Sequence, residues 1–87
     1  VDRSSLMIIP NPTTDRVSIN LSGFAGETIT ISIFGELGQL IWERKLSAGE
    51  EQKLSVSLRE AGASPGIYTV RVRSADGIAA TRVVLVE

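Results

Sequence analysis

The sequence predicts an all-β fold, a seven-stranded antiparallel Greek-key β-sandwich of the immunoglobulin-like kind. Two observations lead to this prediction. Apolar and polar residues alternate through most of the chain, which is the period of a strand rather than that of a helix. Turn-forming residues recur at intervals of about 8–12 residues, a spacing typical of sandwiches and barrels. Clean alternation also favours antiparallel sheets, each with one dry and one wet face.

The first two predicted strands are separated by a break. An apolar run predicts a strand over residues 6–9, and strict alternation predicts a second over residues 16–21. Between them, Pro10 and Pro12 lack a backbone N–H, so a continuous hydrogen-bond ladder is not possible there. We therefore expect the chain to bend, with Asn11 bonding nearby backbone as Asn does in turns.

Three central strands are predicted over residues 27–34, 39–46 and 52–58. We interpret Trp42, which follows two aliphatic residues, as a core residue; the alternative is a platform on which a sugar ring stacks. The stretch 57–63 has some helical character. It is short and ends in glycine and proline, so we expect a turn between strands.

The sixth predicted strand covers residues 66–73 and begins at a proline-glycine corner. Pro65 presets φ and Gly66 tolerates positive φ, so a turn forms here at little cost. Tyr68 follows directly, which is the layout of the tyrosine corner of Greek-key sandwiches. In such a corner the phenol bonds backbone a few residues upstream.

The last predicted strand, residues 79–86, differs from the others because it is apolar on both sides. Asp76-Gly77 before it is typical of a hairpin turn. A half-buried strand needs only one apolar face. Either residues 6–9 cover the second face, or this face or the free edge is left for a partner strand. The residues concerned are Arg82, Val83, Val84, Leu85 and Val86.

Composition limits the chemistry available to the chain. Its 87 residues allow one core, and 43% hydrophobic residues indicate a folded domain. It has no Cys and no His, so disulfides, thiolate metal sites and imidazole catalysis are excluded. Gly49-Glu50-Glu51 and Asp76-Gly77 are the only local hints of a calcium site, without EF-hand spacing. We therefore expect no catalytic, cofactor-binding or metal-binding residues.

Charge and hydropathy exclude two further classes of partner. A net charge of −1 argues against a nucleic-acid binder. The longest apolar runs are four residues, so no membrane insertion is expected. Arg71, Arg73 and Arg82 are placed to share an outer face. Such a face is usually solvated and discourages edge pairing; the alternative is a site for an anionic sugar or lipid.

Four motifs occur in an order and spacing that resemble a known family. They are Pro10-Asn11-Pro12, the glycine Gly38 before Gln39-Leu40-Ile41, the segment from Pro65-Gly66 through Tyr68, and the final strand Arg82–Val86. Together they resemble the type A C-terminal sorting domain of the type IX secretion system of Bacteroidetes. Ile9 stands where the family usually carries Tyr, and Glu87 where its members often end in Lys.

The resemblance implies a non-catalytic address label. Residues 1–5 would be the stub of a linker from upstream cargo, and residues 6–87 the sorting domain. The implied partners are an N-terminally fused cargo domain, an outer-membrane shuttle protein and a sortase-like peptidase that cuts in or before residues 1–5. The implied route runs through the periplasm to the cell surface or the medium. No cofactor and no nucleic acid is implied.

One alternative remains open at this point. The same strand pattern suits a structural or carbohydrate-accessory β-sandwich module beside a secreted hydrolase. Position in the parent gene separates the two, because a sorting domain lies at the extreme C-terminus whereas an accessory module has no fixed place.

Overall fold

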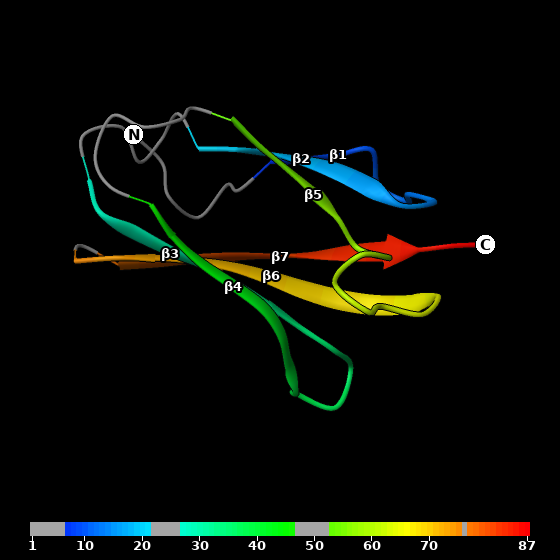
Figure 1. Cartoon of the computed structure of the whole chain (residues 1–87). Helices are drawn as coiled ribbons and strands as arrows, with labels where there is room; N and C mark the ends of the chain where they lie inside the picture. The colour runs from blue at the N-terminus through cyan, green and yellow to red at the C-terminus, as the bar shows by residue number, and fades with distance from the viewer. Residues whose placement is uncertain (1–6, 22–26, 47–52, 76) are drawn as a thin grey trace.

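In a computed structural model, residues 7–21, 27–46, 53–75 and 77–87 are described, and they contain seven strands and no helix (Figure 1). Every predicted strand is present, within two residues of its predicted bounds. The strands are β1 Ile8–Ile9, β2 Arg16–Asn20, β3 Ile29–Phe34, β4 Leu40–Leu46, β5 Lys53–Ser57, β6 Gly66–Ser74 and β7 Gly77–Leu85.

The strands form two antiparallel sheets that face each other (Figure 1). One sheet has the order β1-β2-β5 and the other β4-β3-β6-β7. β2 pairs with β5, and β3 with β6, although neither pair is consecutive in the chain. These crossed pairings confirm the predicted Greek-key sandwich of immunoglobulin-like form.

The core lies between the sheets and is built from alternate residues of the strands. Ile31 and Ile33 of β3 are fully buried, as are Val70 and Val72 of β6 on the neighbouring strand. Trp42 is half-buried and packs against this cluster, so its interpretation as a core residue is confirmed in part.

The connections agree with the turn signals. After β5 the chain makes a single helical turn, in which Ala61 N–H donates to Ser57 O at 3.2 Å, and then reverses at Gly62 with a φ of +91°. The expected turn over 57–63 is therefore confirmed. Ser74 pairs with Gly77, so β6 and β7 form a tight hairpin. Asp76 itself lies outside the described residues, as do the linker 1–5 and Gly49-Glu50-Glu51.

Candidate functional site

The Pro10-Asn11-Pro12 segment bends away from β1 and runs along the outer edge of β7. The predicted break between the first two strands is confirmed, and both peptide bonds before the prolines are cis. The expectation that Asn11 bonds nearby backbone is wrong. Its side-chain Nδ2 donates to Arg82 O at 2.9 Å, and its Oδ1 accepts from Val84 N–H at 3.0 Å.

Thr13 continues this pairing with its backbone. Thr13 N–H donates to Val84 O at 2.9 Å, and Val86 N–H donates to Thr13 O at 2.8 Å. The two segments run parallel at this point. Thr13 is buried, and its hydroxyl donates to Arg16 O at 2.8 Å, which fixes the turn into β2. The edge of β7 is therefore covered from Arg82 O to Val86 N–H.

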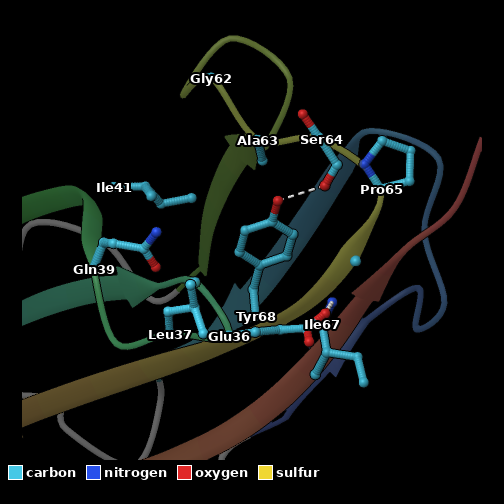
Figure 2. Close-up of a pocket in the computed structure, with 12 residues that line it drawn as sticks. Glu36, Leu37, Gln39, Ile41, Gly62, Ala63, Ser64, Pro65, Ile67 and Tyr68 are labelled. Atoms are coloured by element: carbon cyan, nitrogen blue, oxygen red, sulfur yellow. Dashed lines mark hydrogen bonds between the residues drawn. The ribbon is translucent and has the colours of Figure 1, made fainter.

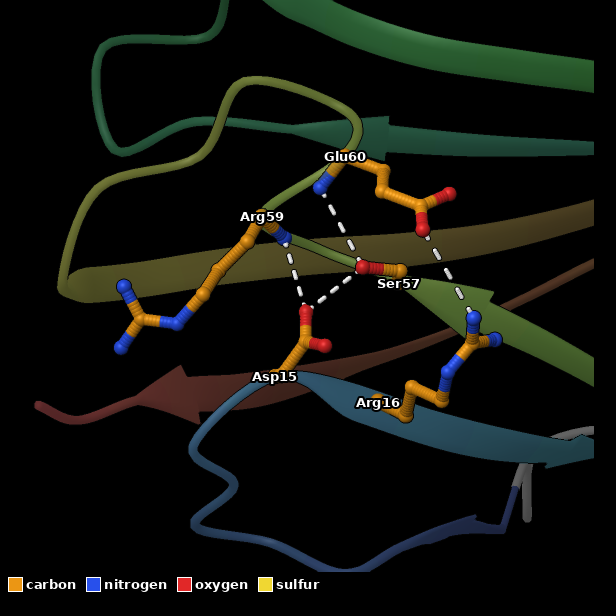
Figure 3. A network of polar contacts seen from close by, with 5 residues as sticks. All are labelled: Asp15, Arg16, Ser57, Arg59 and Glu60. Carbon is orange, nitrogen blue, oxygen red and sulfur yellow. Dashed lines mark hydrogen bonds and ion pairs between the residues drawn. The ribbon is translucent and has the colours of Figure 1, made fainter.

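A polar network joins the start of β2 to the end of β5 (Figure 3). The Ser57 hydroxyl donates to Asp15 Oδ1 at 2.6 Å, and Arg59 N–H donates to the same oxygen at 3.2 Å. Ser57 Oγ in turn accepts from Glu60 N–H at 3.2 Å. The Ser57 hydroxyl, which has the larger effect, and the Arg59 N–H hold the pKa of Asp15 below its ordinary value, because each hydrogen bond stabilises the carboxylate.

The side chain of Arg59 connects this network to the end of the chain. Its Nε donates to Thr14 O at 2.7 Å, and its Nη2 donates to Val86 O at 3.2 Å. The Arg59 side chain thus joins the turn after β5 to the residues just before β2 and to the residue after β7. No local pattern in the sequence marks Thr13, Asp15, Ser57 or Arg59, because each has its main partners far away in the chain.

The tyrosine corner is present as predicted (Figure 2). The Tyr68 hydroxyl donates to Ser64 O, four residues upstream, and the ring is 9% exposed. A pocket of about 310 Å³ lies beside the ring, between this corner and the β3–β4 loop. The Glu36 carboxylate accepts from Ile67 N–H at 3.1 Å, which ties the loop to the corner.

Gly38 sits in that loop with a φ of +88°, the left-handed region that favours glycine. Gly38 N–H donates to Gly35 O at 3.0 Å, and Gly35 N–H donates to Gln39 O at 2.9 Å. The loop thus closes a compact hairpin between β3 and β4. The glycine at position 38 is explained by its positive φ.

The final strand is not covered on both faces. Val83 and Leu85 are fully buried in the core, whereas Val84 is half-buried and Val86 is 38% exposed on the opposite face. The expectation that residues 6–9 cover that second face is wrong, because β1 pairs with β2 in the other sheet. The edge of residues 82–86 is not free either, since Asn11 and Thr13 occupy it.

The residues singled out in the sequence therefore gather at one end of the sandwich. In Figure 1 the C-terminus, the β1–β2 connection and the start of β6 lie at the right-hand end, and the β3–β4 loop lies below them, at the bottom of the view. On one side, Gly66 and Tyr68 of β6 pair with Leu85 and Val83. On the other, Asn11 and Thr13 contact Arg82–Val86. The last strand is thus held between two of the motifs.

Among the described residues, no group of three or more carboxylates is placed to hold a metal ion. No helix in the described part of the chain is long and apolar enough to cross a membrane. This end of the sandwich provides a surface built from segments far apart in the sequence.

A comparison with protein families matches residues 7–87 to the secretion system C-terminal sorting domain. The chain belongs to this family. No curated protein matches the chain. Sorting domains of this family are C-terminal signals for type IX secretion, which exports fused N-terminal cargo towards the cell surface or the medium. The resemblance drawn from the four motifs is confirmed. In this sorting domain, the Pro10-Asn11-Pro12 segment and the Pro65–Tyr68 corner flank the last strand, and the Gly38 loop contacts that corner through Glu36.

Proposed function

We propose that this sorting domain directs its cargo from the periplasm across the outer membrane by presenting one end of the sandwich to the type IX machinery. The observation that carries the proposal is the convergence of Pro10-Asn11-Pro12, the tyrosine corner and the last strand at that end. Because these motifs lie together in space, one partner can contact all of them, although they are far apart in the sequence. The partner is an outer-membrane shuttle protein, and the domain is a ligand rather than an enzyme.

Within this surface, we assign recognition to the outer face of the last strand. Val84 and Val86 lie on that face beside Arg82, whereas Val83 and Leu85 belong to the core. The backbone groups of the adjoining edge are already bonded to Asn11 and Thr13. A partner therefore reads side chains here, not a free strand edge. Pro10, Asn11, Pro12, Pro65, Gly66 and Tyr68 act by holding the strand in place, and Gly38 acts by shaping the loop that Glu36 ties to the corner.

The direct test is a fusion experiment. Residues 1–87 are joined behind a reporter that carries its own export signal, in a bacterium with a type IX system. The reporter should reach the cell surface or the medium, and it should remain in the periplasm of a strain that lacks the system. A reporter left in the periplasm of both strains, despite a folded domain, would reject the sorting function.

A double variant tests whether the outer face of the last strand is the part that the machinery recognises. Val84→Ser with Val86→Ser should leave the domain folded and reduce secretion strongly. The matched control is Met7→Ser with Ile78→Ser, which changes side chains that are 60% and 57% exposed at the opposite end of the strands. The control should be secreted normally. Normal secretion of a folded Val84/Val86 variant would show that this face is not read.

We further propose that a sortase-like peptidase removes the domain after export, with the cut in or before residues 1–5. Mass spectrometry of the exported reporter measures this directly. The mature reporter should end before Met7, the first residue of the family match. An exported reporter that retains the whole domain would contradict processing while leaving the sorting function intact.

A further inference from the structure

The sheet face on which Val84 lies has an unusual distribution of charge over its whole width. It is the outer face of the β4-β3-β6-β7 sheet, which we call the basic face. Val70, Val72 and Val83 point into the core, so the residues between them in β6 and β7 point outward. The register confirms that the three arginines predicted to share a face do so. The cations of the basic face are Lys45, Arg71, Arg73 and Arg82.

Within the ranges that the structure describes, none of these four cations is paired with a carboxylate. Among the described residues, Glu43 is the one acidic side chain on the basic face, and it accepts a hydrogen bond from Ser32 Oγ at 3.1 Å. Glu36 lies beyond the end of the face, where it holds Ile67 N–H. No ion pair within the described ranges involves any of the four cations. The described part of the face thus carries four cations and one carboxylate, in a chain whose net charge is −1.

One of the four cations is fixed by packing. The Arg71 guanidinium lies 4.8 Å from the centre of the Phe34 ring, which is a cation–π contact. Its Nε is buried and has no partner among the described residues. The charge is therefore held against the sheet by stacking. Arg73, Arg82 and Lys45 are exposed around it.

Large apolar side chains stand exposed among these cations. Leu40 is 51% exposed, Ile67 43% and Ile78 57%. In the register, Leu40 pairs with Phe34, Ile67 with Val84, and Ile78 with Arg73, so all three belong to the basic face. Basic residues that attract phosphates and apolar side chains that enter the headgroup region are the combination by which peripheral proteins bind anionic bilayers.

We infer that the basic face binds the surface of an anionic lipid bilayer. The cations lie on β4, β6 and β7, and three strand spacings separate β4 from β7, about 14 Å. Such a spread matches a plane of phosphate headgroups better than a single anionic group. The proposal goes beyond the sorting function, because binding to lipid is a separate activity that does not depend on secretion, although Val84 and Val86 lie at one end of the same sheet face.

The test is sedimentation of the 87-residue domain with vesicles. The domain should bind vesicles of phosphatidylglycerol and phosphatidylcholine, and it should release as salt is raised, because salt screens exposed charges. Binding to vesicles of phosphatidylcholine alone should be much weaker. Equal binding to both vesicle types, or no binding to either at low salt, would overturn the proposal.

Two double variants locate the surface. Arg73→Gln with Arg82→Gln should weaken binding about 25-fold, since each basic residue near an anionic surface contributes about fivefold, or about 1 kcal/mol. The matched control is Arg16→Gln with Lys53→Gln, which removes the same charge from the outer face of the other sheet. An equal loss in the control would overturn the assignment. Soluble polyglutamate can be added as a competitor to the domain bound to anionic vesicles. If it releases the domain as well as unlabelled anionic vesicles do, the basic face docks an acidic protein and not a bilayer.

Discussion

Asn11 pairs with Val84 through its side chain in the way that a neighbouring strand pairs through its backbone. Its Oδ1 accepts from Val84 N–H at 3.0 Å, while its Nδ2 donates to Arg82 O at 2.9 Å. The prolines on either side have no N–H to donate. The carboxamide, which carries both a donor and an acceptor, replaces the missing backbone groups and protects a strand edge that would otherwise be open to pairing.

Asn11→Ala should destabilise the domain by about 1–2 kcal/mol, because two hydrogen bonds to the edge of β7 are lost. Asn11→Asp should be at least as harmful, since it keeps an acceptor for Val84 N–H but points a carboxylate oxygen at Arg82 O. Urea denaturation measures both changes. Hydrogen exchange at the Val84 amide should also become faster. A variant with unchanged stability and unchanged exchange would show that the edge is held by Thr13 alone.

Acid should weaken the junction between β2 and β5 through Asp15. The hydroxyl of Ser57 and then the Arg59 N–H lower the pKa of this carboxyl below its ordinary value of 3.8. Its stabilising effect is therefore complete above that value and is lost as the pH falls through the lower pKa of the folded state.

Asp15→Asn should accordingly give a flatter dependence of the urea midpoint on pH below about pH 4 than the unaltered domain. Glu60→Gln is the charge-matched control, because the Glu60 carboxylate makes only a 3.7 Å ion pair with the exposed Arg16 side chain. A pH profile of Asp15→Asn that superimposes on that of Glu60→Gln would reject this role for Asp15.

The parts of the fold that the sequence predicted are those whose causes are local. Alternating side chains define each strand over a few residues, and the hydroxyl of Tyr68 reaches only four residues back to Ser64. The role of Asn11 was missed because its partners lie 71 and 73 residues away. The ties of Arg59 to Thr14 and Val86 were missed for the same reason. Their residue types are ordinary turn and surface residues, so no pattern in a single sequence marks the contact.

Gly38 offers a test of backbone conformation at a family motif. Gly38→Ala should cost about 1–2 kcal/mol, because an L-residue is strained at positive φ. The site itself is open, with no atom within 4 Å of an added Cβ, so steric contact contributes nothing. Gly38→Asn should cost less, since Asn tolerates the left-handed region better. Equal stabilities of the Ala variant and the unaltered domain in urea would contradict this account.

Tyr68→Phe tests the corner itself. The substitution keeps the ring in the core but removes the hydroxyl that donates to Ser64 O, and an acceptor left without its partner costs about 1–3 kcal/mol. Ser64→Ala is the matched control, because it keeps the carbonyl and should leave the urea midpoint unchanged. Since Tyr68 pairs with Val83, a weakened corner should also loosen the last strand, and amide exchange in β7 should rise in the Phe variant alone. A Phe variant as stable as Ser64→Ala would mean that the phenol does not hold this end of the sandwich.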